Sequence, residues 1–180
     1  MTNRSHVASM TCASVALLAV TLGWEGVAQA EPTLGVRVEV APSLSDSAKT
    51  GVGGHLRFGY QIELPVLFIV PEVGLAYHRF TASAAPDVSI ATPFAGARVG
   101  FGSFVRPYVD AHVGAAHRAY DPTTPADGWS PYFDVGGGLG IRPLRYVEVG
   151  GHVNLQLHPK TNTQPQLNAL GLGIEANVYF

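Results

Sequence analysis

Apolar side chains recur at every second residue through most of the chain, in eight runs between Leu34 and Phe180. A repeat of two places alternate side chains on opposite faces of an extended strand, whereas a helix requires a repeat of about 3.6. Turn-forming residues separate the runs, so each run is a candidate strand. The sequence therefore predicts an all-β chain, with strands over residues 34–42, 53–62, 66–78, 91–101, 107–118, 131–141, 146–157 and 167–180.

The lengths of these runs and of their connections favour a barrel that spans a membrane. Most runs match the roughly 9 to 11 residues that a tilted strand needs to cross a bilayer. The connections alternate between tight turns near 63–65, 102–103 and 143–144 and longer polar stretches at 43–52, 79–90, 119–130 and 158–166. We expect an eight-stranded antiparallel up-and-down transmembrane β-barrel with both termini in the periplasm, where the turns of such barrels are short.

The polar face of the runs indicates which side of the barrel contacts lipid. In the first run, Leu34, Val36 and Val38 alternate with glycine, arginine and glutamate. A soluble sheet alternates too, but its edges are usually protected by lysine, and both lysines of this chain, Lys49 and Lys160, fall in predicted connections. A glycine-rich polar face suits a narrow lumen, so we expect the aliphatic face to meet lipid. The alternative is a soluble secreted barrel that binds an apolar ligand.

Aromatic residues near the strand ends predict two girdles at the membrane interfaces, where amphipathic rings are enriched. The girdle near the short turns would contain Tyr60, Phe68, Phe101, Phe104, Tyr108, Tyr146, Tyr179 and Phe180. The girdle near the longer connections would contain Tyr77, Phe80, Tyr120, Trp129, Tyr132 and Phe133.

The first 30 residues have the pattern of a secretory signal peptide. Arg4 supplies a positive start, residues 13–22 form an apolar stretch too short to span a membrane, and residues 28–30 read Ala-Gln-Ala, a typical cleavage site. Cleavage would leave 31–180 as one barrel domain without cysteine, because Cys12 is the only cysteine. The net charge of -2 and the scattered basic residues give no footprint for nucleic acid.

The signal peptide, the eight alternating segments, the glycine-rich polar face and the closing residues 177–180 resemble the small outer-membrane barrel family typified by the transmembrane domain of outer membrane protein A. The resemblance covers about 31–180. It implies outer-membrane lipid as the surroundings and insertion by the barrel assembly machinery, with Phe180 as part of the assembly signal. Pro71 departs from the pattern, because proline lacks a ladder donor and implies a bulge or a locally broken strand.

The lumen of an eight-stranded barrel is just wide enough to be filled by side chains. Charged residues on the polar face therefore predict a buried network of ion pairs, since buried charges are costly unless they are paired. The alternative is a narrow pore that opens when the pairs exchange partners. The predicted network contains Arg37, Glu39, Arg57, Glu72, Arg98, Asp110, Asp134, Glu148 and Glu175.

Other chemistry finds little support in the sequence. His55, His78, His112 and His152 lie on separate strands without a close-spaced ligand pair, so we expect hydrogen-bonded fillers rather than a metal site. The glycines of 136–140 precede no helix that could hold a phosphate. A lipid A-modifying enzyme would require His117, Ser130 and Asp134 to meet, and the His-x-Ser motif of barrel deacylases is absent. We expect a monomer without catalysis or cofactor.

Overall fold

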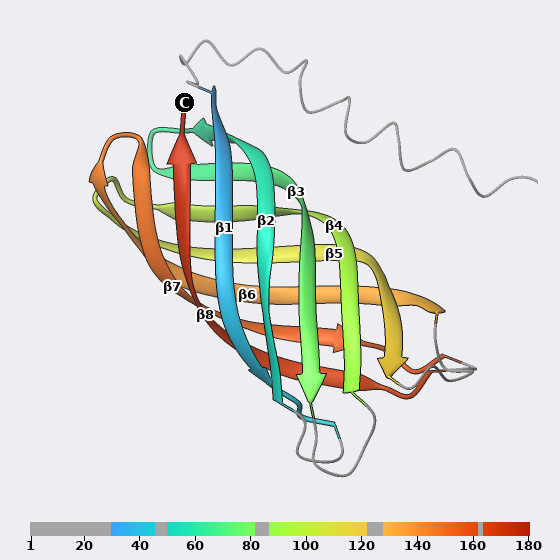
Figure 1. The fold of residues 1–180 in the computed structure, drawn as a ribbon. Coiled ribbons are helices and arrows are strands. Elements are labelled where there is room, and N and C mark those ends of the chain that lie inside the picture. Colours follow the sequence, from blue (N-terminus) through green and yellow to red (C-terminus); the bar gives the residue numbers. More distant parts are fainter. Residues whose placement is uncertain (1–29, 46–49, 82–86, 122–127, 162–163) are drawn as a thin grey trace, which may run out of the picture.

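The computed structural model describes residues 30–45, 50–81, 87–121, 128–161 and 164–180. Each strand pairs antiparallel with the next, and the last pairs with the first, so the sheet closes into a barrel (Figure 1). In the described ranges no helix is long and apolar enough to cross a membrane. The eight strands are β1 (Ala30–Pro42), β2 (Thr50–Glu63), β3 (Leu67–Thr81), β4 (Asp87–Phe101), β5 (Val105–Asp121), β6 (Gly128–Leu144), β7 (Val147–His158) and β8 (Leu167–Tyr179).

The predicted fold class is confirmed. Closure depends on the pairing of β1 with β8, which runs from Thr33 opposite Tyr179 to Val40 opposite Leu172. The start of β1 and the end of β8 lie at the same end of the barrel, with the short turns, and the strand ends that border the longer connections lie at the other end (Figure 1). The predicted signal peptide lies outside the described residues except for Ala30, so its cleavage stays a prediction.

Most strands are longer than the alternation indicated. For example, β5 begins at Val105 and ends at Asp121, whereas the alternation predicts a strand over 107–118. The tight turn predicted near 143–144 lies slightly further along the chain, at Arg145 and Tyr146. A register shift in the β6–β7 ladder near Ile141 carries β6 past the predicted turn, since a bulge adds residues to one strand only.

Pro71 lies within β3 and interrupts one of its two ladders. The β2–β3 pairing includes Gly59 opposite Glu72 and resumes in the same register with Ile62 opposite Ile69. On its other edge Pro71 still pairs with Ala97. Of the two consequences predicted from the missing amide hydrogen, the structure has the local break and not the bulge.

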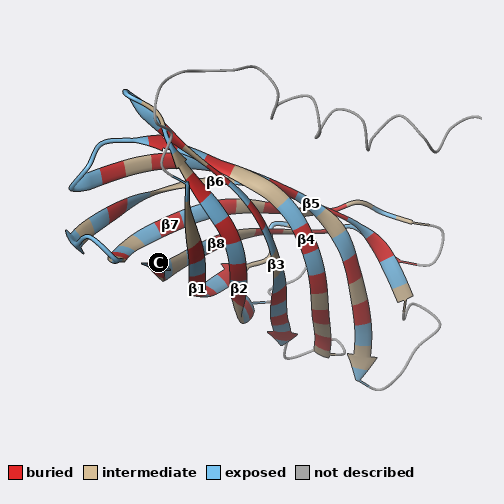
Figure 2. Cartoon of the chain, turned by 90° about the horizontal axis from the view of Figure 1, so that it is seen from above, coloured by how far each residue is buried: buried red, intermediate tan, exposed pale blue. Residues whose placement is uncertain are grey.

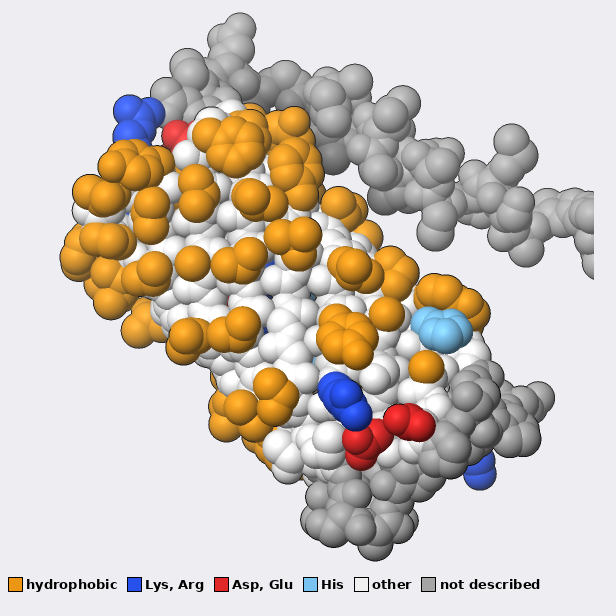
Figure 3. Space-filling model, viewed as in Figure 1, with side chains coloured by type: hydrophobic (Ala, Val, Ile, Leu, Met, Phe, Trp, Pro, Cys, Tyr) orange, Lys and Arg blue, Asp and Glu red, His pale blue; other side chains and the backbone are white. Residues whose placement is uncertain are grey.

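Buried and exposed residues alternate along each strand, as Figure 2 shows, and the side chains on the two faces of the wall differ in chemistry. Val36 and Val38 are exposed on the outside of the barrel, whereas Arg37 between them is 1% exposed. Among the described strand residues that face outward, the charged ones lie at strand ends beside the long connections. They are Arg79, Asp87 and Asp121. Hydrophobic side chains accordingly cover the wall in Figure 3, with charged groups toward its two ends.

The aromatic girdles are present only in part. The predicted members that do face outward are Tyr60, Phe101, Phe104, Tyr146 and Phe180 near the short turns, and Tyr77, Trp129 and Phe133 near the long connections. Five of the predicted members are instead buried inside the barrel, namely Phe68, Phe80, Tyr108, Tyr132 and Tyr179, and Tyr120 is half-buried. The prediction used only position along the strand, although the alternation places Tyr108 on the same face as Asp110.

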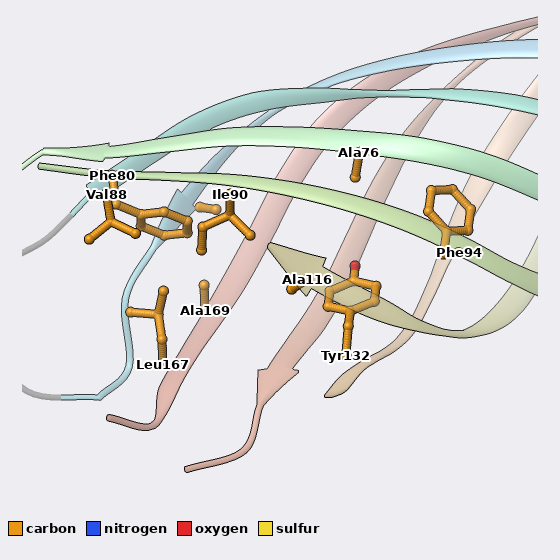
Figure 4. Close-up of a cluster of buried hydrophobic side chains, with 10 residues drawn as sticks. Ala76, Phe80, Val88, Ile90, Phe94, Ala116, Tyr132, Leu167 and Ala169 are labelled. Atoms are coloured by element: carbon orange, nitrogen blue, oxygen red, sulfur yellow. The ribbon is translucent and has the colours of Figure 1, made fainter. Parts of the chain in front are cut away.

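The inward face is not polar throughout. Toward the long connections, buried apolar side chains from several strands pack together inside the barrel (Figure 4). This apolar cluster consists of Ala41, Ala76, Phe80, Val88, Ile90, Phe94, Ala116, Tyr132, Leu167 and Ala169. The larger apolar cluster therefore lies toward the long connections, where Arg118 is also fully buried, and most of the charged side chains lie toward the short turns.

Candidate functional site

The carboxylate of Glu175 on β8 lies at the centre of a group of charged side chains inside the barrel. Its oxygens lie 2.9 Å from the Arg57 guanidinium, 3.2 Å from that of Arg98 and 3.3 Å from that of Arg37. Tyr108 donates a further hydrogen bond of 2.6 Å to the same carboxylate. All of these side chains are buried. One carboxylate on the last strand thus joins arginines on β1, β2 and β4.

Two more carboxylates extend this group. Asp110 lies 3.3 Å from Arg37, and Glu72 lies 3.8 Å from Arg57. Each of the two also contacts a histidine: the distance is 3.0 Å from Asp110 to His152 and 2.7 Å from Glu72 to His112. A guanidinium with two carboxylate neighbours is better compensated than one with a single neighbour, because desolvation of a buried charge must be balanced by several contacts.

Glu148 on β7 connects the group toward the short turns. It lies 3.8 Å from Arg98 and 3.2 Å from Arg106, and Tyr179 donates a 3.0 Å hydrogen bond to it. The guanidinium of Arg106 also lies over the ring of Phe68, 3.8 Å from its centroid. Arg106 was missed from the sequence because the predicted strand began at residue 107. Its alternation with Tyr108 and Asp110 is the signal that identifies it.

Seven of the nine predicted charges are therefore linked through ion pairs: Arg37, Arg57, Glu72, Arg98, Asp110, Glu148 and Glu175. The other two have no recorded arginine partner among the described residues and lie closer to the long connections. Glu39 lies beside His78 at 2.7 Å and His55 at 3.4 Å. Asp134 accepts hydrogen bonds from Tyr132 at 2.7 Å and from Asn154 at 2.8 Å.

Glycines on the inward face leave room for these large side chains. A Cβ at Gly138 would collide with the Tyr108 hydroxyl, and a Cβ at Gly171 would collide with the Asn154 carboxamide. Gly136, Gly138 and Gly140 thus face lumen side chains, in keeping with the interpretation that the glycines of 136–140 leave lumen space, whereas Gly137 faces outward beside Val109.

The three residues considered for an enzyme do not converge. His117 faces outward, where its ring lies 5.0 Å from that of Trp129. Ser130 and Asp134 are buried on the inward face of β6. Because the wall separates the imidazole from the hydroxyl, His117 is not placed to act as a base toward Ser130.

Phe180 follows the last strand and is 67% exposed on the outside of the barrel. Its amide donates a 3.1 Å hydrogen bond to the carbonyl of Pro32. A ring held on the outer face near the β1–β8 closure is accessible to a partner, which is compatible with the predicted role in assembly.

A closed wall of eight antiparallel strands, apolar outside and charged inside, is the architecture of the small outer-membrane β-barrels. Solved structures agree. Neisserial surface protein A superimposes with a TM-score of 0.61 at 16% identity, covering 84% of this chain and 97% of that chain. The outer membrane enzyme PagL gives 0.54 at 13% identity, covering 80% and 98%. Ail, the attachment invasion locus protein of Yersinia pestis, gives 0.53 at 13% identity, covering 85% and 99%.

At these identities the similarity establishes the fold alone. Neither a protein-family model nor a curated protein sequence matches the chain.

Proposed function

We propose that the protein is an integral barrel of a bacterial outer membrane with a structural or surface-interaction role, and that its lumen is closed by the buried ion pairs and the apolar cluster. The single observation that carries the proposal is the distribution of charge across the wall. Arg37 and Glu175 are buried inside, while the outward side chains on the same strands, such as Val38 and Ile174, are exposed.

This distribution supports lipid as the medium around the barrel. Val38 is 59% exposed, Val113 57% and Ile174 68%, in mid-strand positions where a soluble protein would place polar groups. Soluble monomers rarely expose contiguous apolar patches larger than a few hundred Å². A continuous apolar wall around a barrel is therefore best explained by contact with hydrocarbon.

The filled interior supports a barrel that does not conduct. Three arginines converge on Glu175, and the cluster around Phe80 and Ile90 packs inside the barrel toward the long connections. A diffusing solute would have to break several buried ion pairs, each costly to separate. We assign the short-turn end and both termini to the periplasm and the long connections to the cell exterior, where they would make the contacts with partners. The predicted partners are outer-membrane lipid and, through Phe180, the assembly machinery.

Spin labels test the lipid contact directly. Labels at Val38, Val113 and Leu172 are expected to be accessible to oxygen dissolved in lipid and protected from a water-soluble relaxation agent, whereas a label at Lys160 in a connection should show the reverse. Water accessibility at all three wall positions, or recovery of the protein from periplasm without detergent, would contradict the proposal.

Planar-bilayer recording tests the closed lumen. The protein is expected to insert without resolvable conductance steps, and discrete steps would favour the narrow gated pore instead. Mass analysis of lipid A from expressing cells tests the proposed lack of enzymatic activity, because loss or gain of an acyl chain would identify a lipid-modifying enzyme.

A further inference from the structure

Glu39, His55 and His78 come from three neighbouring strands and meet inside the barrel. The register pairs Glu39 of β1 with Gly53 of β2, and Gly53 with His78 of β3. The carboxylate and the imidazole thus flank a residue that has no side chain, and His55 follows on the same inward face of β2. A Cβ at Gly53 would collide with the His78 ring, so the glycine makes room for this cluster.

We propose that Glu39, His55 and His78 bind one divalent transition-metal ion such as Zn²⁺. Two imidazoles and a carboxylate form a recognised zinc donor set. One potential ligand atom from each residue lies within 4.8 Å of the other two. Tetrahedral coordination with bonds of about 2.1 Å separates ligand atoms by about 3.4 Å. The Glu39 oxygen lies 3.4 Å from His55 Nε2 and 2.7 Å from His78 Nε2, so small side-chain rotations suffice.

The cluster has unused bonding capacity. Both ring nitrogens of His55 and Oε2 of Glu39 are buried, and no described residue forms a hydrogen bond with them. A buried polar atom without a hydrogen bond costs about 1 to 3 kcal/mol, so a cation at this position would satisfy atoms that form no hydrogen bond with the described residues. Gln156 reaches across from β7, where its Nε2 contacts the Glu39 carboxylate and lies 3.5 Å from His78 Nε2. If the side-chain amide of Gln156 is flipped, its oxygen takes the place of the nitrogen and becomes a fourth ligand of the metal ion.

A second cluster of Asp110, His112 and Asp134 has similar spacing but is less suited to a cation. Asp110 already lies 3.3 Å from the Arg37 guanidinium, and Nε2 of His112 lies 2.7 Å from Glu72. A nearby guanidinium competes for the carboxylate and repels a metal ion. By contrast, both recorded ion-pair partners of Glu39 are histidines, which become ligands when they are neutral.

The test uses the protein purified from membranes in detergent without a polyhistidine tag. After incubation with Zn²⁺ and removal of free ion, elemental mass spectrometry is expected to find one ion per folded chain. Co²⁺ in place of Zn²⁺ should give the visible absorption bands of a tetrahedral nitrogen and oxygen site. His55→Gln and His78→Gln should each weaken Zn²⁺ binding by more than about tenfold. Substitution of residues that only hydrogen-bond to metal ligands already weakens binding by about this much. The matched control is His152→Gln, a buried histidine beside another carboxylate.

The proposal is overturned if the unaltered protein retains no Zn²⁺, or if His152→Gln loses as much metal as the two ligand variants. Folding of each variant is checked by the migration of unheated and heated samples on a gel. Should a variant fail to fold, unfolding of the unaltered protein decides. Zn²⁺ is expected to raise the urea concentration at the midpoint of unfolding, and a chelator is expected to reverse the shift. A midpoint that changes with neither would reject the site.

Discussion

Arg106 on β5 lies over the ring of Phe68 on β3, with 3.8 Å between the guanidinium carbon and the ring centroid. The same guanidinium lies 3.2 Å from Glu148 on β7 and donates a 2.8 Å hydrogen bond to Gln61 on β2. One side chain thus contacts three strands that are not its neighbours in the sheet. These contacts exist only when the barrel is closed, so they favour the closed form over an open sheet.

Arg106→Met is expected to lower the free energy of unfolding by about 3 kcal/mol, because Glu148 would lose a buried partner while the apolar contact with Phe68 is kept. The measurement is urea unfolding of protein refolded into bilayers. Arg145→Met, at an 80% exposed side chain in the turn, is the control and should change stability by less than about 1 kcal/mol. Equal effects from the two substitutions would show that the lumen contacts of Arg106 contribute little.

Glu175→Gln is expected to destabilise the barrel more than any other single neutralisation in the network, by about 3 to 5 kcal/mol, since it leaves three buried arginines short of a counter-charge. Glu63→Gln, whose partner Arg142 lies at the rim, serves as the comparison. Unfolding in urea would measure both. A loss for Glu175→Gln no larger than that for Glu63→Gln is incompatible with a central role for this carboxylate.

Val113→Arg should cost about 2 to 4 kcal/mol, because it places a charge on the outer face at the middle of β5 and so at the centre of the bilayer. Ala119→Arg, on the same face near the end of the strand, should cost no more than about 1 kcal/mol. Unfolding from lipid vesicles gives both values. Similar costs at the two positions would argue against a membrane centred on the barrel wall.

Gly138→Ala is expected to destabilise by about 1 to 3 kcal/mol, because the added methyl group displaces the Tyr108 hydroxyl that bonds to Glu175. Gly151→Ala, on the adjacent strand β7, is the matched control, since a Cβ there meets nothing within 4 Å. It should be neutral or slightly stabilising. Equal stability of the two variants would mean that the lumen is loose enough to accept extra volume.

Phe80→Ala should remove about 3 to 5 kcal/mol of stability by leaving a cavity in the apolar cluster, where Phe80 is fully buried. Phe80→Leu keeps most of the volume and should cost clearly less. Urea unfolding compares the two variants. A cost for Phe80→Ala below about 1 kcal/mol, well under the roughly 3 to 5 kcal/mol typical for removal of a packed ring, would indicate that the cluster is not tightly packed.

The alternation of side chains determined the fold to a large extent. It placed all eight strands, and with Leu34, Val36 and Val38 opposite Arg37 and Glu39 it assigned the exposed and buried faces of the first strand correctly. The alternation could do this because side chains of a strand point to opposite faces in turn. Once one residue of a strand is assigned to a face, the faces of all its other residues follow. The predicted strand ends were less accurate. Arg106 was left out of the predicted network because the predicted strand began at residue 107.

Which residues meet across the lumen was decided by the tertiary structure. Glu175 and Arg57 are separated by most of the chain, and only the closed barrel brings them to 2.9 Å. The cluster of Glu39, His55 and His78 likewise depends on the register of three strands. A repeat of two specifies the side of the wall on which a residue lies but not its height along the barrel or its neighbours, because these are set by strand register and closure.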